Sequence, residues 1–453
     1  DATLASGFGG DTAEDFTYDA LGRLTEASDD DSIVQFTYDS LGRVLTETQG
    51  ANPLGTTGKT VTTTYDAESN ATVLEYDSGF EAHRSFDAIN RLVAIEDQNS
   101  ASVADLSLYG AAGRTKEVSF ANGTTTTYGW DGFRRPTSIA HETSGSSEFA
   151  GFSYGWDKND NPLYEARSHQ SGKGDVYSYD RANRLTKVLQ DVDDPAAEVA
   201  SPGSETYVDK VEFNMDDVLN FTSLVTTPYG GSASTVSFST NSMNEYSAVG
   251  GVSHYYDANG NLVDDGTNEY VYDWHNHLIE VIAKSGPTTI ATYGYDAYGL
   301  GRRFEKVVGS DTTRFVYADQ QCIEEYDGSD NLLRVFAFGT GLDEVVMMEA
   351  PDQADVDGDS NTTELKRFYY HRQLIGSVTQ VTDPDEQVVE SYDYGPYGKI
   401  EMFDINGSSI SASAIGNPFT YTGRRLDEET GLYYYRARHY SAELKRFIQR
   451  DPL

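Results

Sequence analysis

The chain has 453 residues with 33 basic and 73 acidic side chains, which gives a formal net charge of −40. Such a charge repels phosphate backbones and anionic bilayers and argues against nucleic acid as a partner. No stretch approaches the roughly 18 to 20 apolar residues that cross a bilayer, so membrane insertion is not expected. The single cysteine, Cys322, excludes an intramolecular disulfide and is expected to be a small buried apolar residue.

A short unit that begins with an aromatic residue and Asp recurs along the chain. The dipeptide Tyr-Asp occurs ten times, where about three copies would arise at random, so the excess indicates an internal repeat. The clearest copies, in chain order, are YDALGRL (18–24), YDSLGRV (38–44), FDAINRL (86–92), YDRANRL (179–185), YDANGNL (256–262), YDWHNHL (272–278) and YDGSDNLL (326–333).

Each unit predicts a β-hairpin. Alternating apolar and polar residues flank it, as in Val34, Phe36 and Tyr38, and this alternation is typical of strands. The Asp accepts from backbone amides two residues on, and the later Gly or Asn tolerates a left-handed conformation. A following basic residue, such as Arg23 or Arg43, is placed to reach back to the Asp.

The hairpins predict an all-β fold of long antiparallel strands with little helix. Because long exposed sheet edges invite aggregation, the sheet is expected to curve or to close on itself into a shell or barrel. The abundant Tyr and Phe also favour sheets. The spacing of the units is irregular, so residues 186–250 are expected to hold degenerate copies or an excursion that includes DDPAAEVASPGSE (193–205).

Two segments suggest metal sites at first sight. Asp355, Asp357 and Asp359 alternate as in the first half of a calcium loop, but Lys366 stands where an EF-hand has its Glu. A looser calcium site in a hairpin loop and a solvated acidic loop both remain open. The segment DWHNH (273–277) aligns with the repeat and places His277 at the usual Arg position, which argues against metal binding there.

The C-terminal part carries the most specific pattern. It contains FYYHRQLIGSVTQVTDPDEQVVESYDYGPYGKI (368–400) and NPFTYTGRRLDEETGLYYYRARHYSAELKRFIQRDPL (417–453). With the repeats, these segments resemble the YD-repeat (Rhs) family of bacterial polymorphic toxins, of the C components of insecticidal toxin complexes and of animal teneurins. The resemblance implies that the hairpins form a strip of sheet that spirals into a hollow shell around a C-terminal effector, with the signature segment plugging one end.

The resemblance also implies an aspartyl self-cleavage site. The Arg-Asp-Pro motif of that site matches Arg450, Asp451 and Pro452, whereas the family's second Asp lies further on than Leu453. Since two carboxylates that share a proton are the minimum for such a mechanism, these 453 residues alone are not expected to cleave. Lys445 and Ser441 depart from the family's usual Gly and Asp, which weakens the expectation of activity.

The sequence therefore predicts a YD-repeat β-shell over residues 1–415, with a continuous signature segment over 416–453. The expected function is that of a non-enzymatic, secreted or cell-surface bacterial shell that encloses or displays a C-terminal effector. Because residue 1 is Asp and not Met, it is expected to be a processed or fragment boundary. The alternatives are a fibre or adhesion protein that associates with identical copies, and an enzyme that acts on a polysaccharide, whose glycan the Tyr, Trp and Asp side chains would contact. Calcium is the one cofactor considered.

Overall fold

The computed structural model describes residues 13–51, 58–110, 113–298, 301–352 and 364–451. The described residues form an almost entirely β structure, as the sequence predicts. The short helical elements are α1 (Pro195–Ala200), η2 (Ser168–Gln170) and η3 (Tyr421–Gly423). In this part of the chain, no helix is both long and apolar enough to cross a membrane.

The first half of the chain forms one sheet of 21 strands. Each strand pairs antiparallel with the next one along the chain, so the sheet is a strip that grows by successive hairpins. Its strands are β1 (Asp15–Tyr18), β2 (Leu24–Ser28), β3 (Ser32–Tyr38), β4 (Val44–Ala51), β5 (Lys59–Tyr65), β6 (Ala71–Glu75), β7 (Glu81–Phe86), β8 (Leu92–Glu96), β9 (Ser102–Asp105), β10 (Glu117–Phe120), β11 (Thr125–Trp130), β12 (Pro136–Glu142), β13 (Glu148–Trp156), β14 (Pro162–Arg167), β15 (Gly174–Tyr179), β16 (Leu185–Val192), β17 (Asp209–Met215), β18 (Phe221–Pro228), β19 (Ser234–Thr240), β20 (Tyr246–Val249) and β21 (Val252–Ser253).

A second sheet of 15 strands continues the strip. His254 alone separates β21 from the first strand of this sheet, so the strip passes from one sheet to the other without a long connection. The strands are β22 (Tyr255–Tyr256), β23 (Leu262–Asp264), β24 (Asn268–Tyr272), β25 (Leu278–Ala283), β26 (Thr288–Tyr295), β27 (Arg303–Val308), β28 (Asp311–Ala318), β29 (Gln321–Asp327), β30 (Leu332–Phe338), β31 (Val345–Pro351), β32 (Leu365–Arg372), β33 (Val378–Thr382), β34 (Val388–Tyr394), β35 (Ile400–Asp404) and β36 (Ser409–Ile410).

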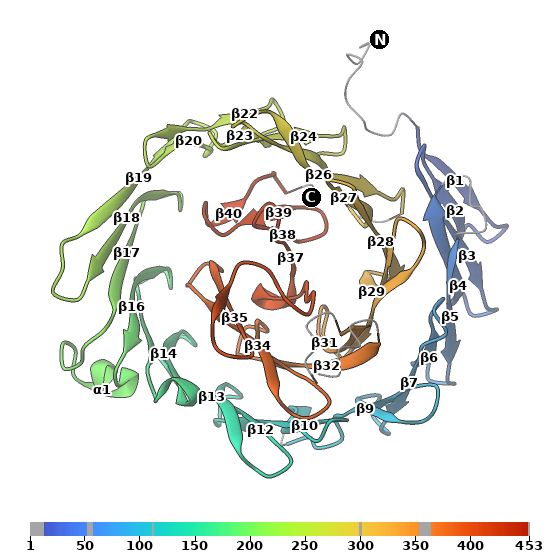
Figure 1. Cartoon of the computed structure of the whole chain (residues 1–453), viewed down its shortest axis with the longest axis horizontal. Helices are drawn as coiled ribbons and strands as arrows, with labels where there is room; N and C mark the ends of the chain where they lie inside the picture. The colour runs from blue at the N-terminus through green and yellow to red at the C-terminus, as the bar shows by residue number, and fades with distance from the viewer. Residues whose placement is uncertain (1–12, 52–57, 111–112, 299–300, 353–363, 452–453) are drawn as a thin grey trace.

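The strip coils inward along the chain, as Figure 1 shows. Strands β1 to β24 run around the outside as an outer turn, and β26 to β36 form an inner turn within it. A third, four-stranded sheet lies at the centre of the coil, whereas the first strand, β1, lies in the outer turn. The strands of the third sheet are β37 (Arg425–Asp427), β38 (Leu432–Tyr434), β39 (His439–Ser441) and β40 (Arg446–Phe447).

The largest hydrophobic core lies between the two turns. It joins outer-turn residues such as Val61 and Phe120 to inner-turn residues such as Phe336 and Phe368. Within the described residues, the pairing does not return to β1 from the end of the strip, so the coil is closed by side-chain packing and not by a hydrogen-bonded ladder. The predicted curved, spiralling sheet is confirmed.

The repeated turn has the local geometry that the sequence predicts. In the first copy, Asp19 Oδ1 accepts from the backbone N–H of Leu21 at 2.8 Å and of Arg23 at 3.0 Å. Gly22 has a φ of +78°, which favours glycine. Arg23 Nε donates to Asp19 Oδ2 at 2.6 Å, so the expected ion pair across the turn forms.

Each turn is also bound to the next one, which the sequence does not reveal. Arg23 Nη1 donates to the carbonyl oxygen of Asp39 at 2.9 Å, and its guanidinium lies 4.7 Å from the ring centre of Tyr38. The Tyr38 hydroxyl donates back to the carbonyl oxygen of Leu24 at 2.5 Å. We call this repeated set of contacts the ladder. Its aromatic-to-carbonyl bonds recur at Tyr65, Tyr109, Trp130, Trp156, Tyr272, Tyr295 and Tyr394.

Successive strands alternate in direction, so the strip has two rims. The Tyr-Asp turns at 18–24 and 38–44 lie on one rim, which we call the YD rim, and the intervening turns lie on the opposite rim. The unit at 326–333 is an exception, because it connects β29 to β30 and lies on the opposite rim. Its sequence matches the repeat, but strand direction decides the rim.

The irregular stretch 186–250 holds both features that the sequence suggests. The turns Asp216–Asn220 and Asn241–Glu245 are degenerate copies, since Asp216 and Asn241 accept the same pair of backbone amides as Asp19. The excursion between β16 and β17 contains α1, whose N-cap is Asp194.

Candidate functional site

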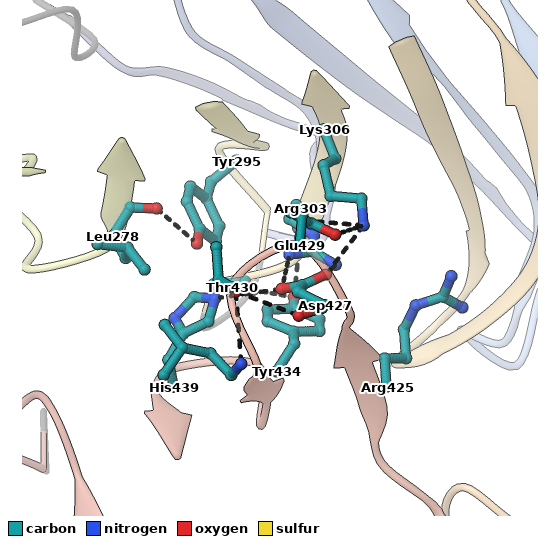
Figure 2. Close-up of polar contacts among 12 residues, drawn as sticks. Leu278, Tyr295, Arg303, Lys306, Arg425, Asp427, Glu429, Thr430, Tyr434 and His439 are labelled. Atoms are coloured by element: carbon teal, nitrogen blue, oxygen red, sulfur yellow. Dashed lines mark hydrogen bonds and ion pairs between the residues drawn. The ribbon is translucent and has the colours of Figure 1, made fainter. Parts of the chain in front are cut away.

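The C-terminal hairpins are attached to the inner turn by a buried ion pair (Figure 2). Arg303, in β27, donates from both terminal nitrogens to the two carboxylate oxygens of Asp427, in β37, at 2.7 and 2.8 Å. Both side chains are about 1% exposed. Lys306 Nζ adds a third contact to Asp427 at 3.2 Å. We call this group the anchor, because it joins the signature segment to the wall.

The electrostatics of the anchor favour a charged Asp427. Burial alone would raise the pKa of its carboxyl group, but the positive charges of Arg303 and Lys306 outweigh burial and hold this pKa well below its ordinary value. Burial lowers the pKa of the neighbouring His439 to about 3, so its imidazole is neutral at pH 7. A buried charge of this kind is costly unless it is paired, so the anchor tolerates neither partner alone.

A second buried group holds the start of β37. Arg425 contacts Glu325, in β29, and Arg334 Nη1 donates to the same carboxylate at 2.5 Å. Burial would raise the pKa of Glu325, but the two guanidinium groups reverse the effect and lower this pKa to about 2. The signature segment is therefore held at two points by charges that stay ionised in the interior.

Tyr434 completes the attachment. Its hydroxyl accepts from the backbone N–H of Arg303 at 2.9 Å and donates to the carbonyl oxygen of Gly301. The guanidinium of Arg303 also lies 4.5 Å from the ring centre of Tyr434. One side chain of β38 thus satisfies backbone groups at the beginning of β27.

The predicted half-site for self-cleavage lies where the end of the chain meets the outer turn. Arg450 Nη2 donates to Glu245 at 2.8 Å, and the Arg450 side chain lies against Gly260. Asp451 forms an ion pair with Arg438 at 3.2 Å and is 54% exposed. The predicted self-cleavage needs two carboxylates that share a proton. The charged neighbour that the structure describes for Asp451 is an arginine, Arg438. The catalytic role of Arg450 and Asp451 stays a prediction.

Two cavities lie between layers of the coil. One has a volume of about 770 Å³ and is lined by outer-turn, inner-turn and C-terminal residues, among them His254, Met402 and Leu432. The other, of about 510 Å³, lies beside Phe36 and Leu342. These volumes are typical of small-molecule pockets of about 300 to 1,000 Å³. A compact domain of about 100 residues has a radius of gyration near 13 Å, so a folded effector does not fit in either cavity.

The other predicted sites have different outcomes. Asp355, Asp357 and Asp359 lie outside the described residues, so the calcium site stays a prediction. Among the residues that are described, no group of three or more His, Cys, Asp or Glu side chains is arranged to hold a metal ion. His277 Nδ1 lies 3.0 Å from Asp273 Oδ2, which confirms that His277 takes the place of the repeat's Arg. Cys322 is buried, as expected.

The sequence did not point to the anchor residues. Arg303 and Asp427 are separated by 124 positions, and neither stands out in a chain with 73 acidic side chains. The one available signal was the pair Arg302-Arg303 at the start of the strand RFEKVV (303–308), because two adjacent basic residues need polar partners if the strand is buried.

The fold and the anchor together define a class: a coiled all-β strip whose C-terminal signature segment is held inside the coil by buried ion pairs. The family model described as Teneurin YD-shell matches residues 223–452, and that described as RHS Repeat matches residues 18–57 and 109–147. The YD-shell match covers half of the chain, so the chain belongs to the teneurin YD-shell family.

Curated relatives and solved structures agree with this assignment. The chain is 30% identical over 230 residues to the tRNA3(Ser)-specific nuclease WapA of Bacillus spizizenii. The aligned region covers 50% of this chain and 9% of that protein. It is 26% identical over 219 residues to the double-stranded DNA deaminase toxin A of Burkholderia cenocepacia, which covers 44% of this chain and 15% of that protein.

A crystal structure of TcdB2-TccC3-TEV superposes with a TM-score of 0.78 at 16% identity and covers 97% of this chain and 24% of that one. The Tc holotoxin pore of Photorhabdus luminescens gives a TM-score of 0.76 with the same identity and covers 97% of this chain and 23% of that one. These likenesses show the fold. The chain spans only a small part of the proteins that it matches, and its role is that of a structural shell.

Proposed function

We propose that this chain is the shell portion of a secreted bacterial toxin-type protein that displays a C-terminal effector. The observation that carries the proposal is the anchor, in which Arg303 and Asp427 hold the signature segment at the centre of the coil. Two similar proteins bear the names of a nuclease and of a deaminase toxin. A folded domain fits in neither of the two cavities described above, and we propose display of the effector by this part of the wall.

The proposal keeps two parts of the sequence prediction. Residues 1–415 form the wall. Residues 416–453 connect the effector to the wall and fix its position. Arg450 and Asp451 supply half of a self-cleavage site, whose second carboxylate comes from residues beyond Leu453. In the protein with its native downstream sequence, Asp451→Asn should therefore prevent cleavage of the chain between the signature segment and the effector, as seen by mass spectrometry.

The test compares two Asp–Arg pairs in the protein with its native downstream sequence. Asp427→Asn breaks the buried anchor, whereas Asp19→Asn breaks a partly exposed surface pair of the same composition. After limited proteolysis and size-exclusion chromatography, we expect the effector to remain with the shell in the wild type and in Asp19→Asn. In Asp427→Asn it should separate from the shell. Equal retention in all three proteins, or a gene that encodes no further domain, would contradict the proposal.

A further inference from the structure

The two rims share one turn geometry but differ in how often the residue at the tip is large and apolar. On both rims, an Asp or Asn side chain accepts from the backbone N–H two residues on, and this bond orients that residue outward. At six turns of the YD rim this tip residue is a large apolar side chain that is 58% to 81% exposed. The six are Leu21, Leu41, Ile89, Phe133, Val218 and Met243.

Four further turns of the YD rim have Glu68, Asn159, Ala182 or Asn259 at this position, whereas no large apolar tip occurs at five described turns of the opposite rim. The corresponding tips there are Asp31, Asn99, Ser329, Asp385 and Asn406. Since the backbone hydrogen bond is the same on both rims, the turn itself does not require an apolar tip. The difference in tip residues is therefore explained by what each rim contacts outside the chain and not by the geometry of the β-turn.

Apolar tips surround the YD rim and are not confined to one hairpin. Trp274, between β24 and β25, is exposed on the outer turn, and Leu342 and Ile375 are exposed on the inner turn. All three lie in turns at the YD rim, because they connect strands in the same sense as the turn at 18–24. Both turns of the coil thus present apolar side chains at one end of the shell.

At five turns of the YD rim the Asp forms an ion pair with the Arg four residues on, whereas Asp66, Asp157, Asp216 and Asp257 accept from an Asn at that position. Asp19 lies 2.6 Å from Arg23, Asp39 lies 2.7 Å from Arg43, and the same pairing recurs further along the strip. The recurrences are Asp87 with Arg91, Asp131 with Arg135 and Asp180 with Arg184. At the five turns with an Arg, an apolar phase that approaches the rim therefore meets balanced charges, even though the chain carries a net charge of −40.

The spacing of the tips favours lipid over protein as the occupant. Strands lie about 4.8 Å apart, so the tips of neighbouring hairpins are about 10 Å apart, with charged pairs between them. A protein interface needs a continuous, well-packed apolar centre, which separated tips do not offer. At a bilayer surface each apolar side chain enters separately, while polar groups stay at the headgroup level.

We propose that the YD rim docks onto the surface of an uncharged, zwitterionic bilayer through its apolar tips. An anionic bilayer is disfavoured, because the rest of the molecule carries a large negative charge whose repulsion acts over about a Debye length. Docking of this kind leaves the strands outside the hydrocarbon and requires no change in the coil. It also orients the opposite rim away from the surface.

The test measures binding of the 453-residue chain to phosphatidylcholine vesicles by co-sedimentation. The variant Leu21→Ser/Leu41→Ser/Ile89→Ser removes three tips and leaves every Asp and Arg of the ion pairs in place. We expect it to lower the partition coefficient at least about tenfold. The matched control, Tyr229→Ser/Ile405→Ser, removes exposed apolar residues from the opposite rim and should bind as the wild type does. Addition of phosphatidylserine at low salt should weaken wild-type binding.

Several results would overturn the proposal. One is a wild-type chain that does not bind phosphatidylcholine, and another is an equal loss of binding in the tip variant and in the control. A third is concentration-dependent self-association that the tip variant abolishes while vesicle binding is absent, which would assign the rim to contact between copies of the chain. Circular dichroism and the urea midpoint, which should match those of the wild type, show that the exposed substitutions leave the fold intact.

Discussion

Neighbouring hairpins within the strip are held together in one way, and the outer and inner turns of the coil are held together in another. In the ladder, the same few contacts recur from hairpin to hairpin, as between Arg23 and Tyr38 and again between Arg43 and Tyr65. Between the turns, each contact is unique. Gln49 bonds both backbone groups of Tyr317, and the Tyr76 hydroxyl donates to the carbonyl oxygen of Phe336 at 2.9 Å.

This difference shows that one set of contacts specifies the strip of hairpins and another set specifies how the strip coils. Repeated local contacts align each hairpin with the next one, and such contacts build a strip of any length. They do not decide where one turn meets another, since every hairpin offers the same partners. The unique buried contacts between the turns, such as Asp97 with Arg367 at 2.6 Å, select one register for the coil.

The largest effect should come from the anchor. Asp427→Asn leaves Arg303 buried and without its charged partner, so we expect a loss of about 3 to 5 kcal/mol in the free energy of unfolding. Urea unfolding followed by tyrosine fluorescence measures this loss. The double variant Asp427→Leu/Arg303→Leu removes both charges and should be less destabilised than Asp427→Asn. A double variant that is worse than the single one would show that the pair is not the cause.

A smaller effect should separate backbone strain from contact between the wall and the C-terminal segment. Gly301 and Gly79 have φ values of +75° and +88°, but a Cβ at Gly301 would lie 2.8 Å from the carbonyl oxygen of Arg436, whereas a Cβ at Gly79 meets nothing within 4 Å. We expect Gly301→Ala to cost about 2 to 4 kcal/mol and Gly79→Ala about 1 kcal/mol, measured as thermal and urea stability. Equal losses would mean that the close approach is unimportant.

The smallest effect is a change in pH dependence. Burial raises the pKa of Asp296 to about 7, although Arg302 lies 2.9 Å away and opposes the shift. The unfolded carboxyl group has a pKa near 3.9, so the folded state keeps a proton that the unfolded state has lost, and stability falls as the pH rises from about 4 to 7.

Asp296→Asn should therefore reduce this fall by about 1 kcal/mol per pH unit between pH 5 and pH 7. Unfolding in urea at pH 5, 6 and 7 measures the slope. Asp180→Asn is the control, because the hydrogen bonds from Arg184, which outweigh its slight burial, lower the pKa of Asp180 and place its titration below this range. A slope that Asp296→Asn leaves unchanged would assign the pH dependence to other buried groups.

The repeated turn could be predicted because all of its partners lie within a few residues of one another. Asp19, Gly22 and Arg23 are close in sequence, and their chemistry specifies the turn without help from the rest of the chain. The substitution of His277 for Arg was visible for the same reason. The signature segment was recognisable from its residues, but its attachment was not, since Arg303 gives no sign of its partner 124 positions away.

The amino-acid sequence by itself determined the hairpins, the all-β class and the family, because these follow from short-range spacing of aromatic, acidic and glycine residues. Only the tertiary structure decided which β-turns lie on the same rim and which part of the inner turn of the coil packs against which part of the outer turn. It also decided which residues pair with the buried charges. The physical reason is that strand direction and burial depend on contacts between residues far apart in the chain. The unit at 326–333 shows this most directly, since it has the sequence of the YD rim and lies on the opposite one.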